Sequence, residues 1–189
     1  TRSFQNSAFI YFTPQGKAHH LWQEESTGKY HIFYAYSSLG EGRESLQPLS
    51  PTGKAQRFLH AVCTPEGTLY AAFCEEAPGP YEQALCLYAL SPEGRLLWQH
   101  RSPLPYKHHL YPQLSLLDKG ELLVTTLASP SPDKWDLAYL RLKPSGEIVE
   151  KGVLLSPVPE RLQWQILSTG GTFWLLSRMP TGYTLHTGS

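Results

Sequence analysis

Two pairs of adjacent histidines stand in nearly identical surroundings and are the first candidates for chemistry. Residues 13–22 read TPQGKAHHLW and residues 102–111 read SPLPYKHHLY, so both segments have Ser or Thr, then Pro, then His-His-Leu and an aromatic residue. Imidazole groups bind metals and act as general acids or bases near neutral pH. A sequence motif that recurs at the same spacing, however, is more typical of an internal repeat than of a functional site.

Two further copies of this motif keep the initial Ser-Pro and have other residues in place of both histidines. They are SPTGKAQRFL, which begins at Ser50, and SPVPERLQW, which begins at Ser156 and is one residue shorter. One position of the motif is basic in every copy, as His20, Arg57, His109 and Arg161. If these four side chains surround one opening, they can bind an anion, a carboxylated sugar or an acidic peptide. The alternative is that they bond loop carbonyls or nearby glutamates and only position the repeat.

The two interpretations of the basic position differ in their pH dependence. Histidine has a reference pKa near 6.5, so anion binding by the four residues should strengthen as the pH falls from about 8 to 6. A metal site is not expected, because adjacent histidines at the end of a loop point apart. No cysteine or acidic residue recurs with them to complete a ligand set.

Composition narrows the class of protein. The chain has 189 residues, of which 41% are hydrophobic, and this is enough to bury the core of one domain. Its formal net charge is zero and no basic stripe is visible, so nucleic acid and anionic membranes are not expected partners. Apolar runs such as GVLL and TFWLL are too short to span a bilayer. The sequence does not begin with Met, which indicates trimming and favours an extracytoplasmic location without settling the compartment.

The cysteine count and the motif search predict no metal and no cofactor. Cys63, Cys74 and Cys86 are odd in number and form no CxxC motif, which argues against a zinc site or a disulfide framework. They are interpreted as small buried residues, with a disulfide between Cys74 and Cys86 on neighbouring strands as the alternative. The sequence contains no P-loop, dinucleotide fingerprint, nucleophile elbow or HExxH motif.

From residue 58 onward, short strands alternate with tight turns. FLHAVC, TLYAAFC, QALCLYAL and RLLWQHR are separated by the turns TPEG and SPEG and by the longer EEAPGPYE, and the next unit repeats this order. Each unit therefore predicts a four-stranded antiparallel sheet. No window shows the 3.6-residue period of a helix, so the fold class is expected to be all-β.

Repeats of this kind are typical of β-propeller blades. We expect a single domain over 1–189, with blades at about 18–49, 55–101, 108–155 and 160–189, the last completed by the strand at 7–12. That N-terminal strand would then close a ring of four blades. The first blade is expected to be incomplete, because too few residues follow YHIFYAYSS for two more strands.

The segment LSPEGRLLWQ is similar to the outer hairpin of blades in WD40-like and PQQ-like β-propeller repeat proteins. This resemblance to propellers in general covers the whole chain. It implies that the innermost strands line a central channel and that one face, rich in long loops, binds the ligand.

Aromatic and acidic side chains gather in the loops of that expected face. Aromatic rings there suit sugar stacking or protein contacts, and they belong to Trp135, Tyr106, Tyr81 and Tyr183. Trp164 and three other tryptophans lie within strands and are expected in the core. The acidic residues of the same loops are Glu41, Glu44, Glu75, Glu76, Glu82, Asp133 and Asp136.

These features predict a non-catalytic binding module that contacts a protein or a glycan, which can be anionic, through the loop-rich face. The alternative is a glycan-acting hydrolase that uses two of the acidic residues, since glycosidases need a pair of carboxyl groups at a set separation. A structural spacer with no ligand is the third possibility.

Overall fold

The computed structural model describes residues 5–26, 28–38, 43–131, 134–160, 162–169, 172–179 and 182–188. Within these residues, β-strands form four separate antiparallel sheets, and the one helical element is a single 3₁₀ turn, η1 (Asp118–Gly120). The all-β class predicted from the sequence is confirmed. In the same part of the chain, no helix is long and apolar enough to cross a membrane.

The strands follow one another in chain order within each sheet. The first sheet contains β1 (Gln5–Phe12), β2 (Lys17–Ser26), β3 (Lys29–Ser38) and β4 (Arg43–Pro48). The second contains β5 (Gln56–Cys63), β6 (Leu69–Glu76), β7 (Gln83–Leu90) and β8 (Leu96–Arg101). The third contains β9 (His108–Leu116), β10 (Leu122–Ser131), β11 (Lys134–Leu142) and β12 (Ile148–Val158). The fourth contains β13 (Gln163–Thr169), β14 (Thr172–Met179) and β15 (Gly182–Gly188).

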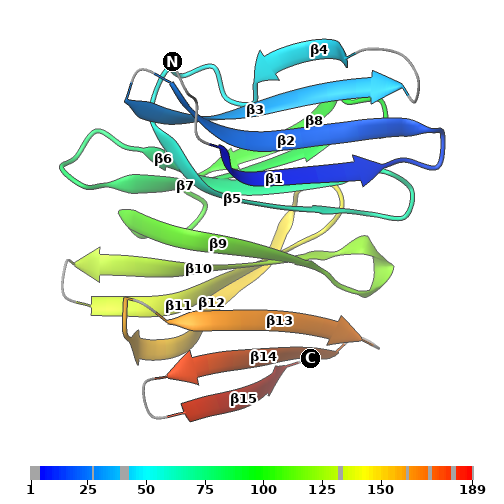
Figure 1. Cartoon of the computed structure of the whole chain (residues 1–189). Coiled ribbons are helices and arrows are strands. Elements are labelled where there is room, and N and C mark those ends of the chain that lie inside the picture. Colours follow the sequence, from blue (N-terminus) through cyan, green and yellow to red (C-terminus); the bar gives the residue numbers. More distant parts are fainter. Residues whose placement is uncertain are drawn as a thin grey trace.

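The four sheets are stacked face to face in the order of the sequence (Figure 1). The first strand of each sheet, here called the inner strand, packs against its neighbour: β5 contacts β1, β9 contacts β5, and β13 contacts β9. Figure 1 places β1 and β15 in sheets at opposite ends of this stack. The arrangement is propeller-like.

Central strands of the second and third sheets, such as β6 and β10, are buried on both faces, which explains their nearly continuous apolar sequences. All residues of β6 except Glu76 are buried, whereas β8 at the sheet edge contains no buried residue. Three apolar clusters fill the spaces between successive sheets, centred on Phe73, on Leu85 and on Leu127. Burial of these layers supplies the main driving force for stacking the sheets.

The N-terminal strand does not belong to the last sheet, so that prediction is wrong. Strand β1 pairs with β2 over most of its length. The link between them is a tight turn in which the Thr13 amide donates to the Lys17 carbonyl at 2.8 Å and the Gly16 amide to Thr13 at 3.1 Å. The same bonds close the TPEG turn between β5 and β6. TPQG is therefore a hairpin turn inside a sheet, and local pairing keeps β1 beside β2.

The first sheet is consequently not short of strands, which corrects the expected incomplete first blade. Strand β1 is its inner strand, and β4 is the single strand supplied by the segment after β3. The three-stranded sheet is instead the fourth, within the described residues. The strands predicted in the second and third sheets are confirmed.

The two central cysteines lie on opposite faces of the second sheet. Cys86 is directly opposite Phe73, and Cys74 is directly opposite Leu85. Residues that are directly opposite share a face, so Cys86 lies on the face of Phe73 and Cys74 lies on the face of Leu85. Side chains alternate between the faces along a strand. A disulfide between Cys74 and Cys86 is therefore ruled out geometrically, and all three cysteines are free.

Polar side chains join each inner strand to the backbone of the next. The Tyr11 hydroxyl donates to the Ala61 carbonyl at 2.5 Å, and the Leu114 amide donates to Nδ1 of His60 at 3.2 Å. At the third junction, the Gln113 amide nitrogen donates to the Trp164 carbonyl at 2.9 Å. One such bond therefore occurs at every junction between successive sheets.

The first junction bond gives a stability prediction. Tyr11→Phe removes the donor to Ala61 while keeping the ring, and we expect the free energy of unfolding to fall by about 1–2 kcal/mol. Urea denaturation measures this change. Tyr81→Phe is the matched control, because Tyr81 is 92% exposed, and it should change the free energy of unfolding by less than about 0.5 kcal/mol. Equal stability of both variants would show that the Tyr11 bond does not hold the sheets together.

Candidate ligand-binding groove

The two ends of the sheets differ in their connections. Tight turns with amide-to-carbonyl bonds of 2.8–2.9 Å close the end that contains residues 64–68, 91–95 and 143–147. The longer connections 49–55, 77–82 and 102–107 lie at the opposite end, here called the loop-rich face, because successive antiparallel strands alternate direction. The predicted asymmetry between minimal turns and long loops is thus present in the second sheet, whereas in the third sheet β11 begins only three residues after the end of β10.

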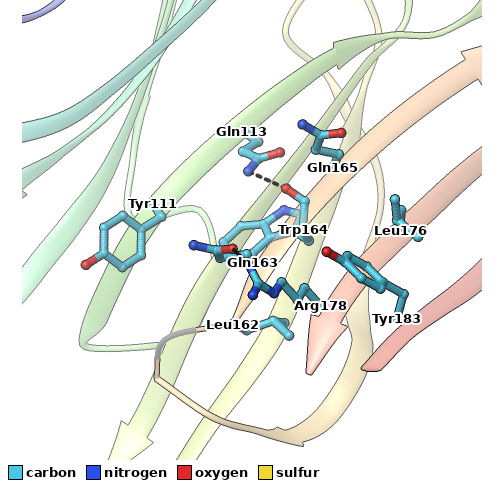
Figure 2. Close-up of a pocket in the computed structure, with 9 residues that line it drawn as sticks. All are labelled: Tyr111, Gln113, Leu162, Gln163, Trp164, Gln165, Leu176, Arg178 and Tyr183. Atoms are coloured by element: carbon cyan, nitrogen blue, oxygen red, sulfur yellow. Dashed lines mark hydrogen bonds between the residues drawn. The ribbon is translucent and has the colours of Figure 1, made fainter. Parts of the chain in front are cut away.

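A groove of about 870 Å³ opens beside the inner strands of the third and fourth sheets (Figure 2). Its residues come from the starts of β9, β13 and β15 and from the end of β14, so it lies toward the loop-rich face. The lining residues are Tyr111, Gln113, Leu162, Gln163, Trp164, Gln165, Leu176, Arg178 and Tyr183. This volume is in the range of small-molecule sites in proteins.

Tyr111 reaches the groove from a strained position in β9. Its φ of +51° is unusual for a residue with a side chain, and the pairing of β9 with β10 shifts at this point, which marks a β-bulge. The residue is 43% exposed. Phe58 has a φ of +61° at the corresponding bulge in β5, and the two rings lie 4.4 Å apart between centroids, tilted by 57°. The bulges thus bring two aromatic rings from consecutive inner strands together.

Amide groups and one guanidinium line the rest of the groove. The bond from Gln113 to the Trp164 carbonyl closes its inner side, while Gln163 and Gln165 are exposed (Figure 2). Arg178 Nη1 is 3.5 Å from Oε1 of Gln163, and its guanidinium lies 6.0 Å from the ring centre of Tyr183. The groove therefore combines flat apolar surfaces with both hydrogen-bond donors and acceptors.

Trp164 lines the groove, but its ring is part of the core, as expected. It is buried, and its indole nitrogen donates to Thr125 Oγ1 at 2.9 Å. Tyr183, expected at the loop-rich face, does line the groove. The other groove residues were not predicted. The LQWQ segment and the Tyr111-Pro112 step inside a strand are the sequence signals that point to them.

The structure does not place His20 with Arg57 or His109. His20 lies on β2, near the β1–β2 turn and hence near the tight-turn end of its sheet, and its Nε2 is 2.8 Å from Ser37 Oγ. The expected fourfold equivalence fails because TPQG is a turn within the first sheet. The neighbouring His19 is buried and links sheets instead, with Nε2 3.1 Å from the Gly67 carbonyl and Nδ1 2.9 Å from the Tyr34 hydroxyl.

His109 is fully buried between strands and is not available to a ligand from solvent. Its ring meets the edge of the Tyr106 ring, 6.1 Å away between centroids. Burial lowers the pKa of His109 to about 4, so the imidazole is neutral near pH 7. The predicted strengthening of anion binding between pH 8 and 6 therefore has no basis in this residue.

Of the two arginines at the basic position, Arg57 lies within the described residues. Arg57 is exposed on the loop-rich face, with its guanidinium 5.7 Å from the ring centre of Tyr30. It lines a separate cavity of about 610 Å³ beside the 77–82 loop. Arg161 lies outside the described residues. The structure thus does not bring His20, Arg57 and His109 to one centre.

The two aromatic candidates, Trp135 and Tyr106, also occupy different positions. Trp135 is half-buried and lines a cavity of about 310 Å³ together with Tyr81, His108 and Glu160. The Tyr106 hydroxyl donates to Asp136 Oδ2 at 3.2 Å, and burial together with this carboxylate raises the pKa of the phenol. Trp135 can contact a ligand, whereas the polar end of Tyr106 is already bound.

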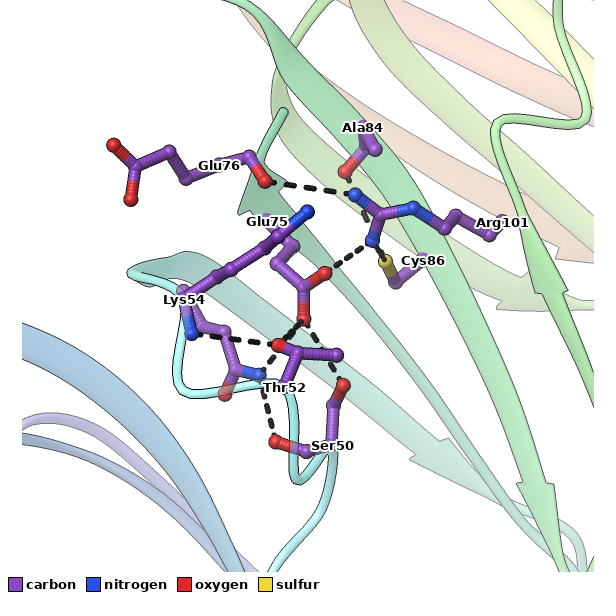
Figure 3. Close-up of polar contacts among 9 residues, drawn as sticks. Ser50, Thr52, Lys54, Glu75, Glu76, Ala84, Cys86 and Arg101 are labelled. Carbon is purple, nitrogen blue, oxygen red and sulfur yellow. Dashed lines mark hydrogen bonds and ion pairs between the residues drawn. The ribbon is translucent and has the colours of Figure 1, made fainter. Parts of the chain in front are cut away.

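Glu75 is buried and fully engaged by its neighbours (Figure 3). Its Oε2 accepts hydrogen bonds from Ser50 at 2.9 Å, Thr52 at 2.7 Å and Gln56 at 3.1 Å, and its Oε1 pairs with Arg101. Burial alone would raise the pKa of Glu75, but these bonds and the arginine lower it overall. A general acid of a glycosidase needs a raised pKa, so Glu75 is suited to structure.

The remaining acidic candidates either bond to other side chains or lie outside the described residues. Asp136 is buried and accepts hydrogen bonds from Tyr106 and, at 2.5 Å, from Ser156. Glu76 lies 3.8 Å from Lys29 and Glu82 lies 3.3 Å from Lys107. Glu41 and Asp133 fall outside the described residues, as does the side chain of Glu44. Among described residues, no group of three His, Cys, Asp or Glu side chains could hold a metal ion.

Comparison with known proteins shows the fold alone. No protein-family profile and no curated protein sequence matches the chain. A protein of unknown function from Dyadobacter fermentans matches 98% of this chain with a TM-score of 0.67 and 10% identity. An endo-arabinase from Bacteroides thetaiotaomicron matches 96% with a TM-score of 0.51 and 16% identity. A puromycin hydrolase matches 96% with a TM-score of 0.59 and 20% identity.

The matched structures are longer than this chain and include β-propellers. The chain spans 66% of the Dyadobacter protein, 72% of the endo-arabinase and 29% of the puromycin hydrolase. The similarity therefore supports the propeller-like arrangement of the sheets. It does not extend to the sequence of any site, because the identities are low.

The buried imidazole of His109 gives a prediction about acid stability. Its pKa is about 4 in the folded protein and about 6.5 in the unfolded chain, so between these values only the unfolded chain binds the proton. Stability is retained above pH 6.5 and is lost as the pH falls toward 4. His109→Leu should remove about 2 to 3 kcal/mol of the loss between pH 7 and 4.5.

Urea unfolding across this pH range measures the effect. The difference between the two proteins at pH 8 reports packing alone, since the imidazole is then neutral in both states, and serves as the internal control. Parallel stability curves for wild type and His109→Leu would show that His109 is protonated equally in both states.

Proposed function

We propose that the protein binds a glycan in the groove beside the inner strands of its third and fourth sheets. The observation that carries this proposal is the position of Tyr111, an exposed aromatic ring held in a left-handed backbone conformation at the groove wall. Such backbone conformations cost about 1–3 kcal/mol and concentrate at functional sites. Phe58 has the same conformation at its bulge without lining the groove, so the support comes from the exposure of the Tyr111 ring in the groove.

The other groove residues supply the chemistry that sugars require. A sugar ring presents apolar C–H faces and hydroxyl groups that both donate and accept hydrogen bonds. Tyr111 and Tyr183 offer flat surfaces for the first, and the side-chain amides of Gln163 and Gln165 can satisfy the second. A glycan is therefore favoured over a protein ligand, the other partner class expected from the sequence.

We further propose that the four sheets are consecutive blades of one propeller-like domain that positions this groove. The support is the repeated pairing order of the sheets, the bond at each inner-strand junction and the similarity in fold to propellers. Inner strands of successive blades converge, so the residues of β9 and β13 can face the same ligand.

A glycan-acting hydrolase is the second candidate, favoured by the similarity in fold to an endo-arabinase. Glycosidases use two carboxyl groups on either side of the bond that is cleaved. The described lining of the groove contains none, and Glu75 and Asp136 are held by other residues. Turnover of chromogenic arabinosides or other glycosides, abolished by Glu160→Gln or Glu82→Gln, would establish this candidate over simple binding.

The role of Tyr111 is tested by Tyr111→Asn. Asparagine adopts positive φ values more readily than most residues, so this change removes the ring without adding backbone strain. We expect the affinity for a bound oligosaccharide to fall on the order of tenfold, as for the loss of one aromatic contact. Isothermal titration calorimetry against a panel of plant and bacterial cell-wall oligosaccharides measures this.

Tyr81→Asn is the matched control for that experiment. Tyr81 also has a positive φ, +61°, and lies on the loop-rich face, but it does not line the groove. Its replacement should leave glycan affinity unchanged. Absence of binding to every glycan in the panel, or equal losses in the two variants, would contradict glycan binding in this groove.

A further inference from the structure

We infer that the glycan is acidic, and that the carboxylate of a uronic acid residue pairs with Arg178. This inference rests on the proposed function and adds the chemical class of the ligand. Arg178 is the one residue with a formal charge at neutral pH among the described residues that line the groove. The others are aromatic, aliphatic or amide side chains, so the local charge is positive in a protein whose net charge is zero.

Arg178 differs from the arginines that stabilise the sheets. Arg101 pairs with Glu75, and Arg141 pairs with Glu121 at 2.7 Å and with Glu150 at 3.8 Å. In the part of the chain that the structure describes, the contacts of Arg178 are the neutral groups of Gln163 and Tyr183. Its charge is thus not neutralised by a carboxylate there, although it lies in a concave site.

The geometry of Arg178 leaves most of its hydrogen-bonding capacity for a ligand. A guanidinium has five N–H donors in one plane, and the bond to Gln163 Oε1, at 3.5 Å, is a weak one. Two parallel N–H groups match the two oxygens of a carboxylate. The Tyr183 ring beside Arg178 supports the flat guanidinium and restricts its orientation.

Neighbouring groove residues allow a sugar to approach with its carboxylate at Arg178. Gln163 and Gln165 follow one side of β13, and Leu176 precedes Arg178 by two residues on the same face of β14. The sugar ring can therefore contact Leu176 and Tyr183 while its hydroxyls meet the glutamine amides. A neutral sugar would use the same contacts but leave the guanidinium without a partner.

The test compares ligands that differ only in charge. Oligogalacturonate, its methyl ester, a neutral arabino-oligosaccharide and a sulfated galactan are titrated into the wild-type protein, Arg178→Gln and Arg57→Gln. Arg57→Gln is the matched control, because it removes the same charge from the loop-rich face outside the groove. We expect oligogalacturonate to bind the wild type at least about tenfold more tightly than its methyl ester.

Arg178→Gln should abolish that preference, while Arg57→Gln should retain it. Equal affinity for the acid and its ester, or the same preference in Arg178→Gln, would overturn the inference and leave glycan binding intact. Tighter binding of the sulfated galactan than of oligogalacturonate would overturn the carboxylate assignment. If none of the four probes binds, the proposed function itself is contradicted for these glycan classes, and the inference falls with it.

Salt and pH give an independent readout of the same contact. Guanidinium groups and sugar carboxylates in general carry their charge between about pH 5 and 9, so affinity for oligogalacturonate should be flat over this range. Raising the salt concentration should weaken binding of the acid and leave the ester unaffected. Binding that rises steeply below pH 7 would assign the contact to a histidine instead of Arg178.

Discussion

The hydrogen bond between a side chain of one inner strand and the backbone of the next fixes how neighbouring sheets align along their strands. Tyr11, His60 and Gln113 each make this contact at successive junctions. Apolar burial stacks sheets without fixing how they slide, whereas these bonds fix one register between neighbours. The groove depends on the third of them, because Gln113 ties β9 to β13 at the point where the two strands line its inner side.

Two candidate acidic residues that are buried are already hydrogen-bonded within the protein, because buried polar groups need partners. Glu75 is surrounded by four donor groups, and Asp136 accepts from two hydroxyls. An unpaired buried carboxylate would be costly, so these residues are bound before a ligand arrives. The groove shows the opposite pattern, since Gln163, Gln165 and Arg178 are exposed and only weakly engaged with the protein. A capacity for further hydrogen bonds, and not residue type, separates the groove from the structural networks.

Features that depend on neighbouring residues in the chain were predictable from the sequence, whereas features that depend on contacts between sheets were not. The strands from Phe58 to Arg101 and their turns were predictable, because TPEG and SPEG close hairpins by bonds within five residues. TPQG is a turn of the same kind and would have predicted the pairing of β1 with β2. Because TPQGKAHHLW resembles the segments that connect successive sheets, it was interpreted as one of them. Burial of His109 and exposure of Arg178 depend on contacts between sheets, which no local pattern contains. Pro112 inside β9 was the one local signal of the bulge, since proline cannot complete a ladder.

The two bulges show how packing between the sheets holds the Tyr111 ring in place at the groove. Phe58 and Tyr111 both occupy positive φ values, which an isolated strand would not tolerate. Leu59 and Pro112, which directly follow these two residues, are buried, and the pairing with β6 and β10 resumes on either side, so the surrounding sheet over-determines both bulges. Contact between the two rings then fixes Tyr111 from its neighbour's side. A ligand meets a ring whose orientation was settled during folding, and its affinity is not reduced by the entropy of ordering that ring.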